Sequence, residues 1–276
     1  KKSGLFFQTA QQGMQKETSL RVTNEIYKPL WNPQTRIVLV TGGRGSGKSD
    51  AVSLCACDEI TSFEDWVTLY TRWTLTSAEI SIIPEFRDKI DILGKRDKVK
   101  VSGNIVRSTE TGSTIIFSGI KAASGTQTAR LKSIKGLNKL IIEEAEEFHD
   151  EKEFNTLDDS LRATGVPNTI IIVMNPQDVD HWIWRRWFAK SHRMEVIDGA
   201  QIPISTHPDI THIHTTYLDN KENLPNTYLE LIENLKLANP DAYAHRYLGK
   251  WQERKEGVIY PNWIEGEFDL TLPYGH

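Results

Sequence analysis

Residues 36–60, RIVLVTGGRGSGKSDAVSLCACDEI, run from an apolar stretch through a glycine-rich turn into a helical pattern. The apolar run at 36–41 is typical of a strand buried in a parallel sheet. Gly42, Gly47, Lys48 and Ser49 fall at the spacing G-x-x-x-x-G-K-[ST]. Such a turn lets backbone N–H groups point at phosphate oxygens, and the following helix adds the positive end of its dipole. The stretch therefore predicts a strand, a phosphate-binding loop and a helix, with a purely structural turn as the alternative.

The predicted loop has an expected contact with each part of a nucleoside triphosphate. Lys48 would reach the β- and γ-phosphates, and the Ser49 hydroxyl would ligate Mg²⁺. The expected cofactors are therefore ATP and Mg²⁺. The expected nucleotide contacts in the loop are Gly42, Gly43, Arg44, Gly45, Ser46, Gly47, Lys48 and Ser49.

Strand and helix patterns alternate along the rest of the chain. Further strands are predicted at 66–71, 139–145, 169–175 and after residue 211, a hairpin from VKVSGNIVRS and STIIFSGI, and helices at 74–90, 154–164, 226–239 and 240–250. This alternation predicts an α/β fold with a mainly parallel central sheet flanked by helices. The expected domains are an N-terminal segment 1–35, a core 36–210, a last core strand with a small helical subdomain 211–257, and the start of a linker 258–276.

Composition sets few limits on function. Hydrophobic residues make up 38% and charged residues 25%, and the formal net charge is -4. That balance does not indicate a nucleic-acid-binding protein, although a local basic patch can act within an acidic whole. No apolar stretch reaches about 18 residues, so no membrane contact is expected. Cys55 and Cys57 lie in the predicted helix without a second ligand pair nearby, so we expect reduced thiols rather than a metal site.

A second acidic motif, KLIIEEAEEF, places Glu143 and Glu144 directly after an apolar strand. One carboxylate can organise Mg²⁺ while the next polarises the attacking water as a general base. Switch GTPases position water with a glutamine, and small-molecule kinases need no water-activating glutamate. The pair therefore predicts an ATPase, with Glu143 at the metal and Glu144 as the base. Glu146 and Glu147 fit a solvated helix start instead.

Five segments, GGRGSGKS, LIIEEAEE, IIIVMNP, HTTYLDNKENLP and NPDAYAHRYLGKW, resemble in that order the large terminase subunit of tailed bacteriophages. The resemblance covers about residues 25–262 and is most specific at GGRGSGKS and EEAEE. It implies a P-loop ATPase of the additional-strand, catalytic-glutamate class that drives double-stranded DNA into a procapsid. It further implies that subunits form a ring, expected to be a pentamer, on the portal protein. Whether the protein is a monomer in solution is left open. A small terminase subunit would select the DNA, and the protein would act in the host cytoplasm without remaining in the mature virion.

The resemblance also implies roles for single residues. Asn175 is expected to sense the γ-phosphate or the attacking water, with a strand-end cap as the alternative. Arg44 is expected to stabilise transition-state charge within its own subunit. Arg130 is expected to reach the ATP of the neighbouring subunit, with a solvated or DNA-facing base as the alternative. Tyr27 is expected to contact the adenine, with core packing as the alternative.

Three further expectations concern nuclease activity, DNA and rival functions. The nuclease domain of the family would follow the last residues here, so no nuclease activity is expected in this chain. The basic segment HWIWRRWFAKSHR (181–193) is better explained as a core helix with solvated arginines, whereas TARLKSIKGLNK (128–139) could face a DNA channel.

The rival functions are another catalytic-glutamate P-loop ATPase acting on nucleic acid, helicase-like or defence-type, and a degenerate loop that only mediates interactions. Intact Lys48, Ser49 and Glu144 argue against the last.

Overall fold

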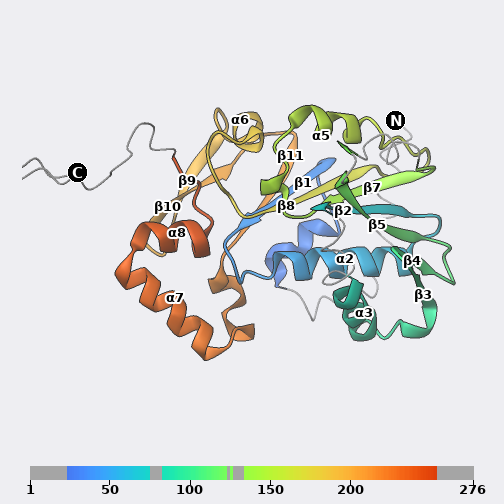
Figure 1. Ribbon diagram of the computed structural model, residues 1–276, viewed down its shortest axis with the longest axis horizontal. Helices are drawn as coiled ribbons and strands as arrows, with labels where there is room; N and C mark the ends of the chain where they lie inside the picture. The colour runs from blue at the N-terminus through green and yellow to red at the C-terminus, as the bar shows by residue number, and fades with distance from the viewer. Residues whose placement is uncertain (1–23, 75–82, 123–124, 127–133, 254–276) are drawn as a thin grey trace, which may run out of the picture.

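A central sheet organises the chain (Figure 1). The computed structural model describes residues 24–74, 83–122, 125–126 and 134–253. The sheet has nine strands in the order β11-β1-β8-β7-β2-β5-β4-β3, with β6 paired to β5. Its strands are β1 (Ile37–Gly42), β2 (Val67–Thr74), β3 (Val99–Ser102), β4 (Ile105–Ser108), β5 (Thr114–Ala122), β6 (Gly125–Thr126), β7 (Leu137–Ile142), β8 (Thr169–Met174) and β11 (Ile210–Thr215). From β11 to β5, every pair of neighbouring strands is parallel. The pairs β5 with β4, β4 with β3 and β5 with β6 are antiparallel.

Helices cover both faces of this sheet (Figure 1). The helices of the described residues are η1 (Glu25–Leu30), α2 (Lys48–Ser62), α3 (Ile83–Ile92), η3 (Arg96–Lys98), η4 (Ala145–Glu147), α5 (Glu151–Asp158), α6 (Trp182–Trp187), η5 (Tyr217–Asn223), α7 (Asn226–Ala238) and α8 (Pro240–Leu248). α2 and α3 lie on one face, α5 and α6 on the other, and α7 and α8 stand at one end. Within the described ranges, no helix is long and apolar enough to cross a membrane.

The central strands are apolar throughout because both of their faces are covered. Successive side chains of a strand point to opposite faces. In β1, Val38 and Val40 join the core under α2 and α3, whereas Ile37 and Leu39 join the core under α5 and α6. The continuous apolar runs of the sequence therefore indicated parallel strands correctly, and the predicted α/β architecture is confirmed.

Two predicted helices have different bounds in the structure. Of the helix expected at 74–90, the structure describes α3, which begins at Ile83. Pro84 lies in its first turn, where the missing backbone N–H of proline costs no hydrogen bond. Residues 75–82 lie outside the described part of the chain. The helix expected at 154–164 is α5, which starts earlier because the Asp150 side chain accepts a hydrogen bond from the backbone N–H of Lys152.

The β-rich parts of the chain differ more from the sequence prediction. The expected two-stranded hairpin is three strands, since β3 and β4 already pair with each other across Gly103 before β5 begins. The ribbon of β9 (His192–Ile197) and β10 (Ala200–Ser205) was not predicted. Its turn is Asp198-Gly199, both at positive φ, which is the dipeptide favoured in tight hairpin turns. That dipeptide between alternating segments could have revealed the ribbon.

The tryptophan-rich segment 181–193 is mostly a core element, as expected. Trp182 and Trp187 in α6 are each 1% exposed. The guanidinium of Arg186 lies 5.2 Å from the centre of the Trp187 ring and pairs with Glu151 at 3.2 Å. These contacts of Arg186 fasten α6 to α5, whereas Arg185, Lys190 and Arg193 are exposed, as expected for solvated basic residues.

The C-terminal elements form a separate small core beside the phosphate loop. Tyr217, Ile232, Tyr243 and Tyr247 from η5, α7 and α8 pack together with Ile202 from β10. We call this cluster the C-terminal subdomain, and the expected bounds 211–257 stay a prediction. The strand β11, which was expected as a last core strand, lies at the edge of the central sheet next to β1.

One residue of the predicted basic segment 128–139 is buried rather than free for DNA. Lys139 at the start of β7 is 2% exposed and forms an ion pair with Glu59 of α2. Its ammonium also lies 5.7 Å from the centre of the Trp66 ring. Lys139 therefore ties α2 to the sheet, which corrects its expected place in a DNA channel.

Removal of one partner of this ion pair should cost far more stability than removal of both. Lys139→Met leaves the Glu59 carboxylate buried without its cation, and we expect a loss of about 3–5 kcal/mol in the free energy of unfolding. The double variant Lys139→Met with Glu59→Leu should recover most of that loss, because apolar pairs of similar volume replace buried ion pairs well. Urea unfolding measures both, and equal losses in the single and double variants would contradict the assignment.

Candidate active site

Apart from Tyr27 and Arg130, the predicted site residues meet at one edge of the sheet. β1, β8, β7 and β2 are adjacent and parallel, so the segments that follow their carboxyl ends lie side by side. These segments carry the loop 42–49, Asn175, the glutamate pair and the end of β2. Residues 44–49 of the loop, the glutamate pair and Asn175 line a cavity of about 440 Å³. The site therefore depends on strand order, which brings residues far apart in the sequence into one place.

The glycines of the loop are required by close backbone approach. A Cβ atom on Gly42 would lie 1.9 Å from the Thr215 carbonyl oxygen, and one on Gly43 would lie 2.0 Å from the Tyr247 carbonyl oxygen. Gly47, directly before α2, has φ of 85°, a conformation that glycine adopts without strain. The loop is thus seated on β11 and on the end of α8.

Hydrogen bonds from three other elements hold the loop in shape. The backbone N–H of Arg44 donates to the Arg246 carbonyl at 2.9 Å, and the Asn220 side chain donates to the Gly45 carbonyl at 2.9 Å. The Tyr27 hydroxyl donates to the Ser46 carbonyl at 2.9 Å. Tyr27 is 2% exposed, so its ring packs in the core and its hydroxyl braces the loop.

Lys48 is buried at the centre of the site. Its ammonium donates to the carbonyls of Gly42 and Gly43 at 3.0 and 2.7 Å and to Oδ1 of Asn175 at 3.0 Å. Burial lowers the pKa of Lys48 to about 8, while the charges of Glu146 and Glu143 oppose the shift. The structure thus brings together the predicted phosphate lysine and the predicted sensor asparagine.

Arg72 at the end of β2 holds both glutamates of the acidic pair, and sequence reasoning did not find it. Its guanidinium lies 3.0 Å from Oε2 of Glu143 and 3.5 Å from Oε1 of Glu144. Burial disfavours the Arg72 cation, but the two carboxylates outweigh that effect and raise its pKa above the ordinary value. Arg72 has no motif around it, because its role arises only from the pairing of β2 with β7.

The two glutamates have different environments. Glu143 is 2% exposed, whereas the side chain of Glu144 is 44% exposed and lines the cavity. The backbone of Glu144 has φ of 52°, an uncommon value for a residue other than glycine, and such conformations concentrate at functional sites. The turn at Glu144 directs the chain from β7 into η4, leaving one carboxylate buried and the other facing the cavity.

The residues present fit a magnesium ion. Oε1 of Glu143 is buried and has no hydrogen-bond partner among the described residues, although Oε2 is bound to Arg72. Ser49 lines the same cavity. A hard cation that keeps most of its waters and takes one carboxylate, one hydroxyl and substrate phosphates suits this donor set.

Glu146 corrects the expectation of a solvated helix start. It is partly buried, and its two carboxylate oxygens accept hydrogen bonds from the backbone N–H of Asn175 at 3.2 Å and from its Nδ2 at 3.1 Å. Burial raises the pKa of Glu146, and its bonds to Asn175 oppose the shift. Glu147 is exposed, as expected.

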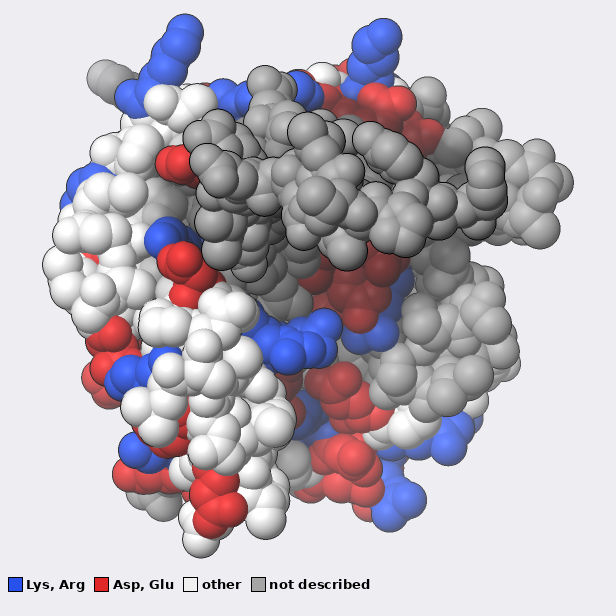
Figure 2. Space-filling model, turned by 60° about the vertical axis from the view of Figure 1, so that its left-hand side comes forward, with Lys and Arg blue, Asp and Glu red and all other residues white. Residues whose placement is uncertain are grey.

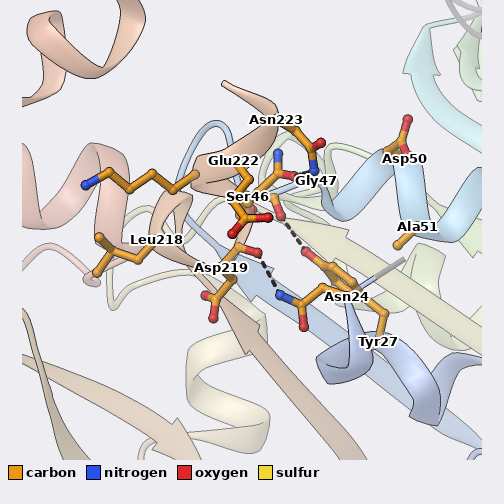
Figure 3. Close-up of a pocket in the computed structure, with 12 residues that line it drawn as sticks. Asn24, Tyr27, Ser46, Gly47, Asp50, Ala51, Leu218, Asp219, Glu222 and Asn223 are labelled. Atoms are coloured by element: carbon orange, nitrogen blue, oxygen red, sulfur yellow. Dashed lines mark hydrogen bonds between the residues drawn. The ribbon is translucent and has the colours of Figure 1, made fainter. Parts of the chain in front are cut away.

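A second cavity of about 600 Å³ adjoins the loop on the side of η1 and η5 (Figure 3). Asn24, Tyr27 and Asp219 lie on its walls, and the Asn24 side chain donates to the Asp219 carbonyl at 2.6 Å. Ser46, Gly47, Asp50 and Asn220 line both cavities, so the two are neighbours. The expected adenine contact of Tyr27 stays a prediction, and this side chain lines the cavity although it is 2% exposed.

The structure describes only one of the two candidate arginines. Arg44 is exposed and lines the cavity that contains Lys48 and the glutamates. Arg130 lies outside the described residues. The roles of both arginines in catalysis stay predictions.

A family model described as phage terminase large subunit matches residues 34–250, which is most of the chain. This chain belongs to the phage terminase large subunit family. The PBSX phage terminase large subunit of Bacillus subtilis (strain 168) is 26% identical over 219 residues, which covers 78% of this chain and 49% of that protein. The chain thus spans about half the length of this curated terminase relative.

Solved terminase structures share the fold. The large terminase of a thermophilic bacteriophage matches with a TM-score of 0.62 and 16% identity over 83% of this chain and 53% of that chain. The ATPase domain of the Thermus phage P74-26 large terminase matches with a TM-score of 0.53 and 16% identity over 83% of this chain and 94% of that domain. The expected P-loop NTPase fold of the large terminases is therefore confirmed.

In this terminase chain, two histidines connect the loop strand to the C-terminal subdomain. The Ser205 backbone donates to Nδ1 of His212 at 3.0 Å, and Nε2 of His212 lies 2.8 Å from the Thr41 hydroxyl. That hydroxyl lies 2.8 Å from Nδ1 of His214, whose Nε2 lies 2.9 Å from the Leu248 carbonyl. Because the first partner only donates and the last only accepts, the chain has one direction and both rings are neutral.

Acid should therefore destabilise the fold. Burial lowers the pKa of His212 to about 3 and of His214 to about 4, and that of His181 also to about 4, from 6.5. Below pH 6.5 the unfolded chain binds protons that the folded chain does not. Stability therefore falls between pH 6.5 and about 4 for His214 and His181, and down to about 3 for His212, by about 1.4 kcal/mol per pH unit at most for each histidine. Thermal unfolding measures this slope. His212→Gln should flatten it and the control His207→Gln should not; equal slopes would contradict the assignment.

Proposed function

We propose that this chain hydrolyses ATP as the motor part of a phage DNA-packaging enzyme. The observation that carries the proposal is that Glu143 and Glu144, fixed by Arg72, face the same cavity as Lys48 and Ser49. A phosphate-binding lysine opposite two carboxylates in different environments is the arrangement that water attack on a γ-phosphate needs. The large terminase of the thermophilic bacteriophage, which shares the fold, has been solved in complex with ADP and with ATP-gamma-S.

The residues divide the chemistry between them. On binding ATP, Lys48 would exchange its contacts to the Gly42 and Gly43 carbonyls for the β- and γ-phosphates. Glu144 has the exposure needed to reach a water in the cavity and accept its proton. Arg72 holds the Glu144 carboxylate in the orientation for that transfer. Bound Mg²⁺, held by Ser49 and Glu143, would neutralise the charge of the phosphates.

The remaining contacts complete the nucleotide site. The cavity of about 600 Å³ beside Ser46 and Gly47 has the position and volume for the nucleoside, with polar groups from Asn24 and Asp219 at its walls. Arg44 is placed to stabilise transition-state charge within the subunit. Arg130 is proposed to act on the ATP of a neighbouring subunit in a ring, expected to be a pentamer.

The packaging part of the proposal concerns the whole protein. Its partners would be double-stranded DNA, the portal protein of a procapsid and a small terminase subunit, in the cytoplasm of the host. On the face shown in Figure 2, basic and acidic side chains are interspersed, and no broad surface of positive charge stands out among the described residues.

A packaging assay tests this proposal. The full-length protein, supplied with procapsids, ATP and linear DNA, should protect that DNA from added nuclease, and Lys48→Ala should abolish the protection. Lys98→Ala is a matched control, because Lys98 forms only an exposed ion pair with Glu110. ATP hydrolysis without DNA protection would instead favour another nucleic-acid ATPase. In mixed rings, wild-type neighbours should rescue Arg130→Ala if this arginine acts across subunits.

A further inference from the structure

Asn175 is held by partners of opposite hydrogen-bonding character. Its Nδ2 and backbone N–H donate to the carboxylate of Glu146 at 3.1 and 3.2 Å. Its Oδ1 accepts from the Lys48 ammonium at 3.0 Å. Glu146 as a carboxylate can only accept, and Lys48 can only donate. These partners leave the amide of Asn175 one favourable orientation.

The reversed amide would lose both contacts. Its oxygen would face the Glu146 carboxylate, and its NH2 group would face the Lys48 ammonium, so both hydrogen bonds would become repulsive contacts. The site is partly buried, which strengthens both the attraction and the repulsion. Each oxygen of Glu146 accepts one hydrogen bond from Asn175, so this carboxylate is held against the end of β8.

We propose that Glu146 is a positioning residue that fixes the amide of Asn175 with its acceptor oxygen toward Lys48 and the phosphate site. The proposal rests on the proposed ATPase function and deepens it. An oxygen in that place binds the lysine ammonium or a hydrogen of the attacking water, and it is repelled by phosphate oxygens. The Oδ1 atom of Asn175 therefore orients Lys48 or the water, and η4 is coupled to the end of β8 through Glu146.

Exchanging the two functional groups gives a sharp test. Glu146→Gln places an NH2 group against a donor of Asn175, and Asn175→Asp places two carboxylates together. In the double variant Glu146→Gln with Asn175→Asp, the new amide at position 146 can donate to the new carboxylate at position 175 and accept from the backbone N–H there. That carboxylate still accepts from Lys48. The double variant thus restores all three hydrogen bonds, with one donor and acceptor interchanged.

The expected result is rescue of turnover in the full-length protein. Each single variant should lower kcat for ATP hydrolysis by about 10- to 100-fold, as loss of a supporting contact typically does. The double variant should recover most of that loss. Its KM for ATP should rise, because the carboxylate now lies closer to the phosphates, so kcat at saturating ATP is the decisive quantity. Glu147→Gln, at the exposed neighbouring glutamate, should match the wild type in both constants.

Two outcomes would overturn the proposal. Glu146→Gln with wild-type kcat would show that the amide needs no fixing, and a double variant as slow as the single ones would show that position 146 needs a carboxylate for another reason. Melting temperatures without nucleotide are measured alongside. Each single variant should melt lower, and the double variant near the wild type. A wild type that hydrolyses no ATP would refute the proposed function, while the melting series would still decide the pairing of Glu146 with Asn175.

Discussion

Glu144→Gln should stop ATP hydrolysis while ATP remains bound. Glutamine has the shape of glutamate but cannot take a proton from water, and loss of a general base typically costs about 100- to 10,000-fold in rate. Binding should persist because the loop, Lys48 and Glu143 are unchanged. Phosphate release measures the rate, and retention of labelled ATP after rapid gel filtration measures binding.

Glu147→Gln is the matched control for this substitution. Glu147 lies three residues further along and is exposed, so this variant should hydrolyse ATP at the wild-type rate. If Glu144→Gln hydrolyses ATP as fast as the control, Glu144 is not the base. If it no longer retains ATP, its role lies in binding rather than in proton transfer.

Arg72→Met should damage both stability and hydrolysis. The side chain of Glu143 is 1% exposed and that of Arg72 12%, so the substitution leaves a buried carboxylate without its cation. We expect a loss of about 3–5 kcal/mol in the free energy of unfolding. Hydrolysis should fall by about 10- to 100-fold, since Glu144 also loses its orienting contact.

Two further variants separate the causes. Arg72→Lys keeps the positive charge but cannot contact both glutamates with a planar fork, so it should recover stability more than hydrolysis. Arg96→Met removes an exposed pair with Asp91 and should change unfolding by less than about 1 kcal/mol. Urea unfolding and phosphate release measure the two effects. An Arg72→Met protein as stable and as active as Arg96→Met would refute the assignment.

The sequence alone predicted those features whose signals are local. The strand, loop and helix around Lys48 are contiguous, so spacing and apolar pattern were sufficient. Glu143 and Glu144 were found because they directly follow an apolar strand. Asn175 was assigned through the family resemblance, and the structure places it against Lys48.

The features that sequence reasoning did not find depend on contacts across the fold. Arg72 has no motif, and only the pairing of β2 with β7 brings it to the glutamates. Glu146 resembles its exposed neighbour Glu147 in the sequence, yet η4 turns it toward Asn175. Lys139 was predicted to belong to a basic surface, but its position in a central strand buries it against Glu59.

The most direct test of the central claim is a structure of the Glu144→Gln variant with ATP and Mg²⁺. The triphosphate should lie in the loop 42–49, with Lys48 at its β- and γ-phosphates and Mg²⁺ between Ser49 and Glu143. The glutamine at position 144 should face a water opposite the γ-phosphate. A loop without nucleotide at saturating ATP, or a triphosphate bound away from Lys48, would contradict the account.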